Sequence, residues 1–206
     1  MIPVKKQPEP ADFEDKVAKK GRKFLSQNPR PNNWKNRSYW TEVLPDLWNA
    51  YHSVCAYCCH WIPPEQSSAS VDHFIPKSIS PERAYDWDNY RLAALKMNAK
   101  KGDFTDVIDP FELTEATFWL LFPSMQVKPN PQLSENQKMR IWDTIRRLDL
   151  NDDEVLVNAR LRWVLNYCDK HIDFEFLREN APFIAFEIER QNLHDKLAII
   201  FRRRNI

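Results

Sequence analysis

Apolar residues recur at helical spacing in the first quarter of the chain. Positions 13, 17, 24 and 25 give one apolar side to a helix that Asp12 can cap and that runs to about Ser26. Positions 39, 43, 47 and 51 predict a second helix over residues 38–51, which Pro45 divides or kinks. The first ten residues contain three prolines, so we expect them to form an extended arm.

The middle of the chain changes from a strand pattern to a helix pattern. Residues 70–75 predict a short strand closed by Pro76, and a loop that carries Pro81 leads to the next apolar segment around Leu92. Residues 94–101 favour a short helix that ends at Gly102. The segment therefore predicts an antiparallel strand pair followed by a helix.

The C-terminal half is mainly helical after one hairpin. Apolar alternation over residues 118–127 predicts a hairpin turning at Pro123 and the next residue, with helix as the rival interpretation. Ser134 and Gln137 make a capping box for a helix to about residue 148. Asn151 with Glu154 starts the next helix, which we expect to reach residue 171, and two shorter helices follow over 174–180 and 182–191.

These elements predict an α+β fold in which a strand-strand-helix unit is embedded in one mostly helical domain. We divide the chain into an N-terminal arm with basic helices over residues 1–54, a core over 55–103, and a hairpin with supporting helices over 104–206. A length of 206 residues favours a single domain.

Composition excludes several classes of protein. With 43% hydrophobic and 29% charged residues, the chain fits a soluble globular protein rather than a disordered one. It has neither an apolar run of membrane-spanning length nor the apolar region of a signal peptide, so we expect no membrane association and a cytoplasmic location. Its two glycines cannot form a Walker-type loop or a dinucleotide fingerprint, so any ATP dependence must come from a partner.

Charge is balanced overall and uneven along the chain. The formal net charge is +1, yet no acidic residue lies between Asp15 and Glu42, where basic and aromatic residues alternate. This mixture is typical of a surface that neutralises phosphates and stacks on bases, although a solvated helix face beside core aromatics gives the same pattern. The terminal run 202–204 of three arginines is a second candidate phosphate contact, or a solvated tail.

Three side chains near the predicted strand pair suit the hydrolysis of a phosphodiester. His73 can act as the general base, because imidazole titrates near neutral pH. Asp72 and Asn98 offer oxygen ligands, which favour Mg²⁺ or Mn²⁺ over Zn²⁺. Neighbouring strand residues point to opposite faces, so the strand must end or bend near His73 for both to serve one site. Lys101 lies one turn beyond Asn98 and can reach a phosphate.

The order Asp-His, Asn, Asn with basic residues after it resembles the HNH nuclease family, whose fold is a ββα-metal finger. The resemblance covers about residues 55–103 and implies a metal-dependent DNA endonuclease in which His73 is the base and Asp72 and Asn98 hold the metal. It also implies that Asn89 braces the loop and so orients His73. We expect four basic residues to contact the nucleic acid: Lys77, Arg91, Lys100 and Lys101.

The cysteines match only part of the zinc site found in many HNH proteins. Cys55 and Cys58 correspond to the first Cys-x2-Cys pair, but Ala94 and Met97 stand where the second would be. Cys168 and His171 could complete a structural zinc site from a distant helix. The alternative is a pair of buried thiols with an ordinary surface histidine.

The whole chain resembles small stand-alone HNH proteins of bacterial anti-phage systems such as Septu. That resemblance implies a partner ATPase of the ABC or SMC type and a role as the effector nuclease. The alternative function is a non-cutting nucleic-acid-binding or adaptor module built on the same scaffold, against which the complete set of Asp72, His73 and Asn98 speaks.

Overall fold

The computed structural model describes residues 1–64 and 68–201, and the arginines at 202–204 lie outside that part of the chain. The described chain divides into two compact units, one of residues 4–56 and 62–105 and the other of residues 1–3, 57–61 and 106–206. The sequence led us to expect one domain. The chain length could not distinguish one domain from two compact units. The second unit exists because the C-terminal hairpin and helices bury an apolar core of their own, including Leu120, Ile145 and Ile184.

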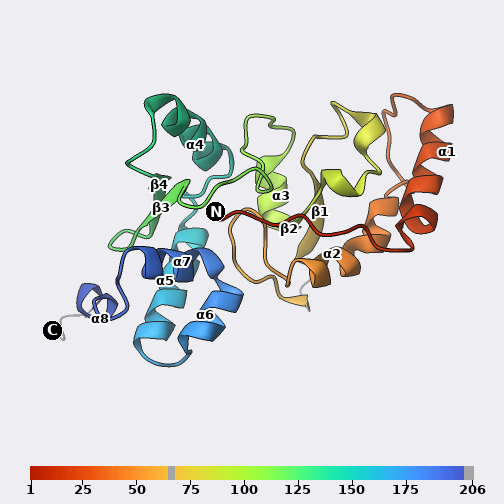
Figure 1. Cartoon of the computed structure of the whole chain (residues 1–206). Coiled ribbons are helices and arrows are strands. Elements are labelled where there is room, and N and C mark those ends of the chain that lie inside the picture. Colours follow the sequence, from red (N-terminus) through yellow and green to blue (C-terminus); the bar gives the residue numbers. More distant parts are fainter. Residues whose placement is uncertain (65–67, 202–206) are drawn as a thin grey trace. The chain divides into compact units, whose positions relative to one another are not determined.

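The unit of residues 4–56 and 62–105 contains the strand pair and the N-terminal helices (Figure 1). Its first elements are η1 (Glu14–Ala18), α1 (Lys19–Gln27), η2 (Tyr39–Val43) and α2 (Leu44–Ala50). They are followed by β1 (Ala69–His73), η4 (Pro81–Arg83), η5 (Trp87–Asn89), β2 (Tyr90–Ala94) and α3 (Leu95–Lys101).

The first helix differs from the prediction at its start. It opens with a π-helical turn, η1, whose N-cap residue is Phe13 and makes no side-chain capping bond. The predicted cap, Asp12, instead forms an ion pair with Lys16 in the next turn. The predicted role for Asp12 was therefore wrong, because its carboxylate finds a stronger partner in a nearby ammonium group than in backbone N–H groups.

Pro45 divides the next helical segment as predicted. The residues before it form the 3₁₀ helix η2, and α2 begins with the proline in its first turn. A proline is tolerated there because the first N–H groups of a helix have no partner within the helix.

The predicted strand pair is antiparallel, and Asp72 lies opposite Arg91 while His73 lies opposite Tyr90. β1 ends at His73, two residues earlier than the predicted strand 70–75. The backbone leaves the ladder because the N–H of Ile75 donates to the side chain of Asn89 rather than to a strand. α3 follows β2 directly and ends at Gly102, which has a φ of 48°, as the C-cap glycine predicted.

The second unit contains β3 (Phe118–Leu121) and β4 (Gln126–Pro129), which pair antiparallel and confirm the predicted hairpin. Its helices are α4 (Glu135–Arg147), α5 (Glu154–Cys168), α6 (Phe174–Asn180), α7 (Pro182–Arg190) and α8 (Leu197–Ile200). No helix in the described part of the chain is long and apolar enough to cross a membrane.

Capping explains where these helices begin. The capping box of Ser134 and Gln137 is present with both of its hydrogen bonds. α5 is capped by Asp153 and not by the predicted Asn151, whose side chain instead bonds the backbone of Val127 in the hairpin. α5 also stops at Cys168, three residues before the predicted end at position 171.

At Gly21, helix α1 makes a close contact with the loop after β1. A Cβ added at Gly21 would overlap the side chain of Tyr85, so the helix can lie against that ring only because position 21 has no side chain. The contact fixes α1 beside Ala84 and Tyr85, which also contact the candidate site described below.

We predict that Gly21→Ala lowers the free energy of unfolding by about 1–3 kcal/mol, because the added methyl group overpacks this contact and forces Tyr85 to move. Urea unfolding followed by circular dichroism measures the change. Ser26→Ala, at an exposed position of the same helix, serves as the control and should stay within about 0.5 kcal/mol of the parent. Equal stability of all three proteins would contradict the close contact.

Candidate active site

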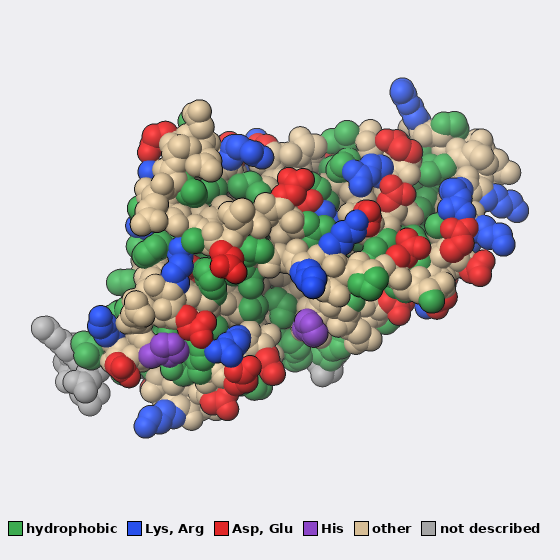
Figure 2. Space-filling view, in the orientation of Figure 1, with side chains coloured by type: hydrophobic (Ala, Val, Ile, Leu, Met, Phe, Trp, Pro, Cys, Tyr) green, Lys and Arg blue, Asp and Glu red, His purple; other side chains and the backbone are tan. Residues whose placement is uncertain are grey.

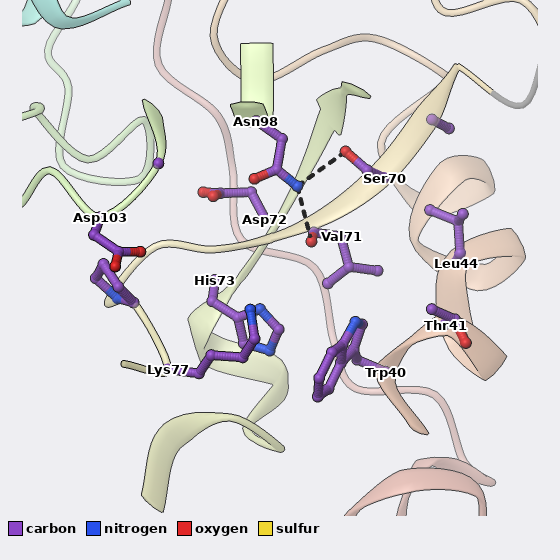
Figure 3. Close-up of a pocket in the computed structure, with 13 residues that line it drawn as sticks. Trp40, Thr41, Leu44, Ser70, Val71, Asp72, His73, Lys77, Asn98 and Asp103 are labelled. Carbon is purple, nitrogen blue, oxygen red and sulfur yellow. Dashed lines mark hydrogen bonds between the residues drawn. The ribbon is translucent and has the colours of Figure 1, made fainter. Parts of the chain in front are cut away.

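A pocket of about 400 Å³ runs along the unpaired edge of β1 (Figure 3). All five residues of β1 line it, together with Trp40, Thr41 and Leu44 on one side and Asn98 of α3 on another. Side chains from both faces of a strand can reach a pocket only at the strand edge. This position resolves how Asp72 and His73, which are neighbours in sequence, both contribute to one site.

His73 is held in one orientation by its Nε2 atom. This nitrogen lies 2.9 Å from the carbonyl oxygen of Ala84, which can only accept a hydrogen bond, so Nε2 carries the proton. Nδ1 of the neutral ring is then an unprotonated acceptor. The rings of Trp40 and Tyr90 pack edge-on against the imidazole, with centroid distances of 4.7 and 5.3 Å.

The pKa of His73 is lowered to about 4, mainly by burial; the bond to Ala84 opposes the shift, and the nearby ammonium groups of Lys77 and Lys101 add to it. Only 7% of the residue is exposed. The ring is therefore neutral at physiological pH, which is the state that a general base requires.

Asn89 braces the loops on both sides of His73. Its Oδ1 accepts from the backbone N–H of Ile75 at 2.8 Å, and its Nδ2 donates to the carbonyls of Ile75 and Arg83, each at 3.0 Å. Arg83 precedes the residue whose carbonyl accepts from His73. The side chain is 1% exposed and does not line the pocket, a position that is compatible with the expected bracing role.

Asn98 presents its amide oxygen toward Asp72. Its Nδ2 donates to the Ser70 hydroxyl at 3.1 Å and to the Val71 carbonyl at 3.2 Å. Because a carbonyl cannot donate, these partners fix which end of the amide is nitrogen. Figure 3 shows the Asn98 oxygen on the side of the Asp72 carboxylate, so that oxygen atoms of two different side chains lie at the same pocket.

Lys101 is fully buried, and this overturns its predicted contact with nucleic acid. Its Nζ lies 3.4 Å from Oδ1 of Asp72 and donates to the carbonyl of His73 at 2.9 Å, with exposed fractions of 0% and 2% for the two paired side chains. Burial lowers the pKa of Lys101, and the Asp72 carboxylate opposes that shift. The side chain is a structural cation that joins α3 to the end of β1.

Arg91 is also buried, with 3% exposure, and it donates to the carbonyls of Asp88 and Tyr90 while lying over the Phe74 ring. Its predicted contact with nucleic acid was wrong, because the guanidinium group is buried against the backbone of its own strand and loop. Lys77 lines the pocket and Lys100 is half-buried outside the lining.

Three of the four predicted zinc ligands lie in one unit of the described chain. Among residues 1–64 and 68–201, no three His, Cys, Asp or Glu side chains form a group that could hold a metal, so Cys58, Cys168 and His171 make no such set within their unit. The Cys55 thiol accepts from the backbone N–H of Ala94 at 3.3 Å. Ala94, one of the two residues at which the resemblance led us to look for a second cysteine pair, thus bonds the Cys55 sulfur through its backbone.

The lining residues that were not predicted as part of the site include Trp40 and Asp103. Trp40 forms one wall against His73, and Asp103 brings a carboxylate that accepts from Ser78 at 2.8 Å. Trp40 lies in the stretch of basic and aromatic residues between Asp15 and Glu42, but nothing in the local spacing connects it with His73. Asp103 follows the C-cap glycine of α3, where an exposed turn residue is the ordinary expectation.

The chain is similar to the Septu protein PtuB of Bacillus thuringiensis. The two are 25% identical over 162 residues, which is 78% of this chain and 59% of PtuB. The chain therefore spans less than two thirds of the length of PtuB. No protein-family model matches the chain.

We predict that His73 makes folding stability pH-dependent between its ordinary pKa of 6.5 and its folded value of about 4. The unfolded chain binds the proton in this range and the folded chain does not, so stability is present above 6.5 and is lost as the pH falls toward 4. Between pH 7 and pH 4 this loss is about 3 kcal/mol.

The measurement is urea unfolding of the parent and of His73→Gln at both pH values. The parent should lose more stability than the variant by that amount, and the difference cancels contributions from other groups. Equal losses in the two proteins would show that His73 is not buried in its neutral form.

We predict that Lys101→Met lowers the free energy of unfolding by about 3–5 kcal/mol, because it leaves the Asp72 carboxylate buried without its cation. Lys96→Met at an exposed position of the same helix should change it by less than about 0.5 kcal/mol. Thermal and urea unfolding of both variants test the buried pair, and equal effects would contradict it.

Proposed function

We propose that this protein is a metal-dependent HNH endonuclease that hydrolyses phosphodiester bonds of DNA. The observation that carries the proposal is the meeting, in one pocket, of a neutral buried imidazole and two oxygen ligands, from Asp72 and Asn98. The strand-strand-helix order of β1, β2 and α3 and the spacing of these residues support it, because both resemble the ββα-metal finger.

His73 would take the proton from the attacking water. Its Nδ1 is the free acceptor of the ring, since Nε2 is occupied by the carbonyl of Ala84. A pKa near 4 makes His73 a weak base. The same low pKa keeps the imidazole in the unprotonated form, which can accept a proton from water. Asn89 would act indirectly, by holding the backbone on which the ring depends.

The donor set fits one hard divalent cation. Asp72 and Asn98 present a carboxylate and an amide oxygen to the same pocket, and Mg²⁺ or Mn²⁺ in such sites keeps most of its other positions for water and substrate phosphate. When bound, the ion would neutralise charge on the phosphoryl group and the leaving oxygen. Asp103 and Ser70 border the space in which water and phosphate would lie.

A role in anti-phage defence rests on the similarity to the Septu protein PtuB. By that analogy the protein would act in the cytoplasm as an effector nuclease beside a partner ATPase of the ABC or SMC type. A partner would have to supply any ATP dependence, because the chain's two glycines cannot form a phosphate-binding loop of the Walker type.

The second candidate is a non-cutting nucleic-acid-binding or adaptor module. The buried pair of Asp72 and Lys101 favours it, because a protein cation already neutralises the carboxylate that would hold the metal. Metal binding would then have to draw Asp72 oxygens into coordination while Lys101 stays in place.

We predict that the purified protein cleaves DNA with Mg²⁺ or Mn²⁺ and that His73→Ala lowers the rate at least about 100-fold, the lower end of what a positioned base contributes. Agarose-gel assays of plasmid and oligonucleotide substrates measure this, alone and with a partner ATPase. His171→Ala, which removes an exposed histidine elsewhere, should retain the parent rate.

Folding of each variant is checked by circular dichroism. Parent-level cleavage by folded His73→Ala would overturn the assignment of the base. No cleavage by the parent under any condition, together with DNA binding that Asp72→Asn leaves unchanged, would favour the adaptor module.

A further inference from the structure

A second pocket lies beside α1, in the same unit as the candidate active site. Its volume is about 230 Å³, and it is open to solvent. Six residues line it, and three are cationic, two are aromatic and none is acidic: Lys20, Lys23, Phe24, Gln27, Arg37 and Tyr39. We call this the α1 pocket.

Two of the three cations of the α1 pocket, Lys23 and Arg37, differ from neighbouring basic residues of α1 in having no acidic partner within the described part of the chain. Lys19 and Arg22 each pair with an acidic side chain of η1. In contrast, Lys23 and Arg37 make no ion pair with any residue in the described part of the chain. Figure 2 shows Lys and Arg side chains gathered over α1 with Asp and Glu among them. Positive charge without a carboxylate partner is thus concentrated at the pocket.

Lys20 adds a third cation that a ligand can recruit. Its ammonium group pairs with Glu42 at 2.8 Å, but both side chains are more than 40% exposed. An exposed pair of this kind contributes little free energy, about 0–1 kcal/mol. A phosphate can therefore compete with Glu42 for Lys20.

Two aromatic rings lie directly against these cations. The Arg37 guanidinium lies over the Phe24 ring at 5.3 Å from its centroid, and the Lys20 ammonium lies over the Tyr39 ring at 5.7 Å. Both rings are only half-buried. Cations for phosphates beside ring faces for bases are the combination with which proteins hold unpaired nucleic acid strands.

The α1 pocket and the candidate active site are lined by consecutive residues of the chain. Tyr39 lines the α1 pocket, and the next residue, Trp40, lines the active-site pocket and contacts His73. The Cα atoms of consecutive residues are about 3.8 Å apart. In addition, the Tyr85 hydroxyl donates to the carbonyl of Arg37 at 2.9 Å, and Tyr85 follows the residue that holds His73.

We infer that the α1 pocket binds a nucleotide of an unpaired nucleic acid strand, with a phosphate between Lys23 and Arg37 and a base against Tyr39, and that it places that strand at the edge of the active site. The binding itself is independent of the proposed nuclease function. Only the delivery of the strand to His73 rests on it.

The test measures binding without cleavage. Fluorescence anisotropy with a labelled oligothymidylate of about 15 nucleotides, in EDTA, gives the dissociation constant for each variant. The double variant Lys23→Gln/Arg37→Gln should bind about tenfold more weakly and show a salt slope smaller by about 0.7, since one phosphate is no longer neutralised. The matched control Lys19→Gln/Arg22→Gln removes the same charge and should bind within about twofold of the parent.

Stacking is tested separately at Tyr39. Tyr39→Ala should weaken binding about fivefold or more, whereas Tyr39→Phe keeps the ring and should bind like the parent. Oligouridylate in place of oligothymidylate distinguishes RNA from DNA as the source of the strand. Urea unfolding of each variant confirms that the fold is retained.

Three results would overturn the inference: equal loss of affinity in the two double variants, tighter binding of duplex than of single strand, or competition by polyglutamate as effective as that by unlabelled oligonucleotide. The outcome is separable from that of the proposed function. Binding that Lys23→Gln/Arg37→Gln leaves unchanged, with cleavage that still requires His73, removes the α1 pocket alone. Binding that depends on Lys23 and Arg37, without any cleavage, removes the nuclease alone.

Discussion

The fully buried ammonium group of Lys101 is the constraint on which the candidate site depends. A buried charge must be paired and hydrogen-bonded. Lys101 lies in the last turn of α3, and its partners are the Asp72 carboxylate and the carbonyl of His73 in β1. These bonds fix α3 against the end of β1. Asn98 lies one turn earlier on the same helix, so the same constraint sets the position of its amide above the strand edge.

A second set of bonds fixes the imidazole. The Ala84 carbonyl accepts from both His73 Nε2 and the Tyr90 hydroxyl, each at 2.9 Å. Burial raises the pKa of Tyr90, so the phenol remains a donor. Asn89 holds the residue before Ala84, and the close approach of Gly21 to Tyr85 brings α1 against the residue after it. The orientation of His73 and the position of the basic helix therefore depend on the same short loop.

Features that depend on local sequence could be predicted. The capping box at Ser134, the C-cap at Gly102 and the hairpin near Pro123 all follow from residues within a few positions of one another. Asp12 and Asn151 were misassigned as caps, because each finds a partner that local propensity does not weigh: Lys16 in the next turn and the backbone of Val127 in the hairpin.

The candidate site divides in the same way. The sequence by itself determined which chemical groups are present and in what order, since Asp72, His73, Asn89 and Asn98 could be selected from residue type and spacing. Only the tertiary structure decided that Lys101 faces inward. An ammonium group is ordinarily exposed, and it is buried here because a carboxylate and a carbonyl from a strand 28 residues away in sequence surround it.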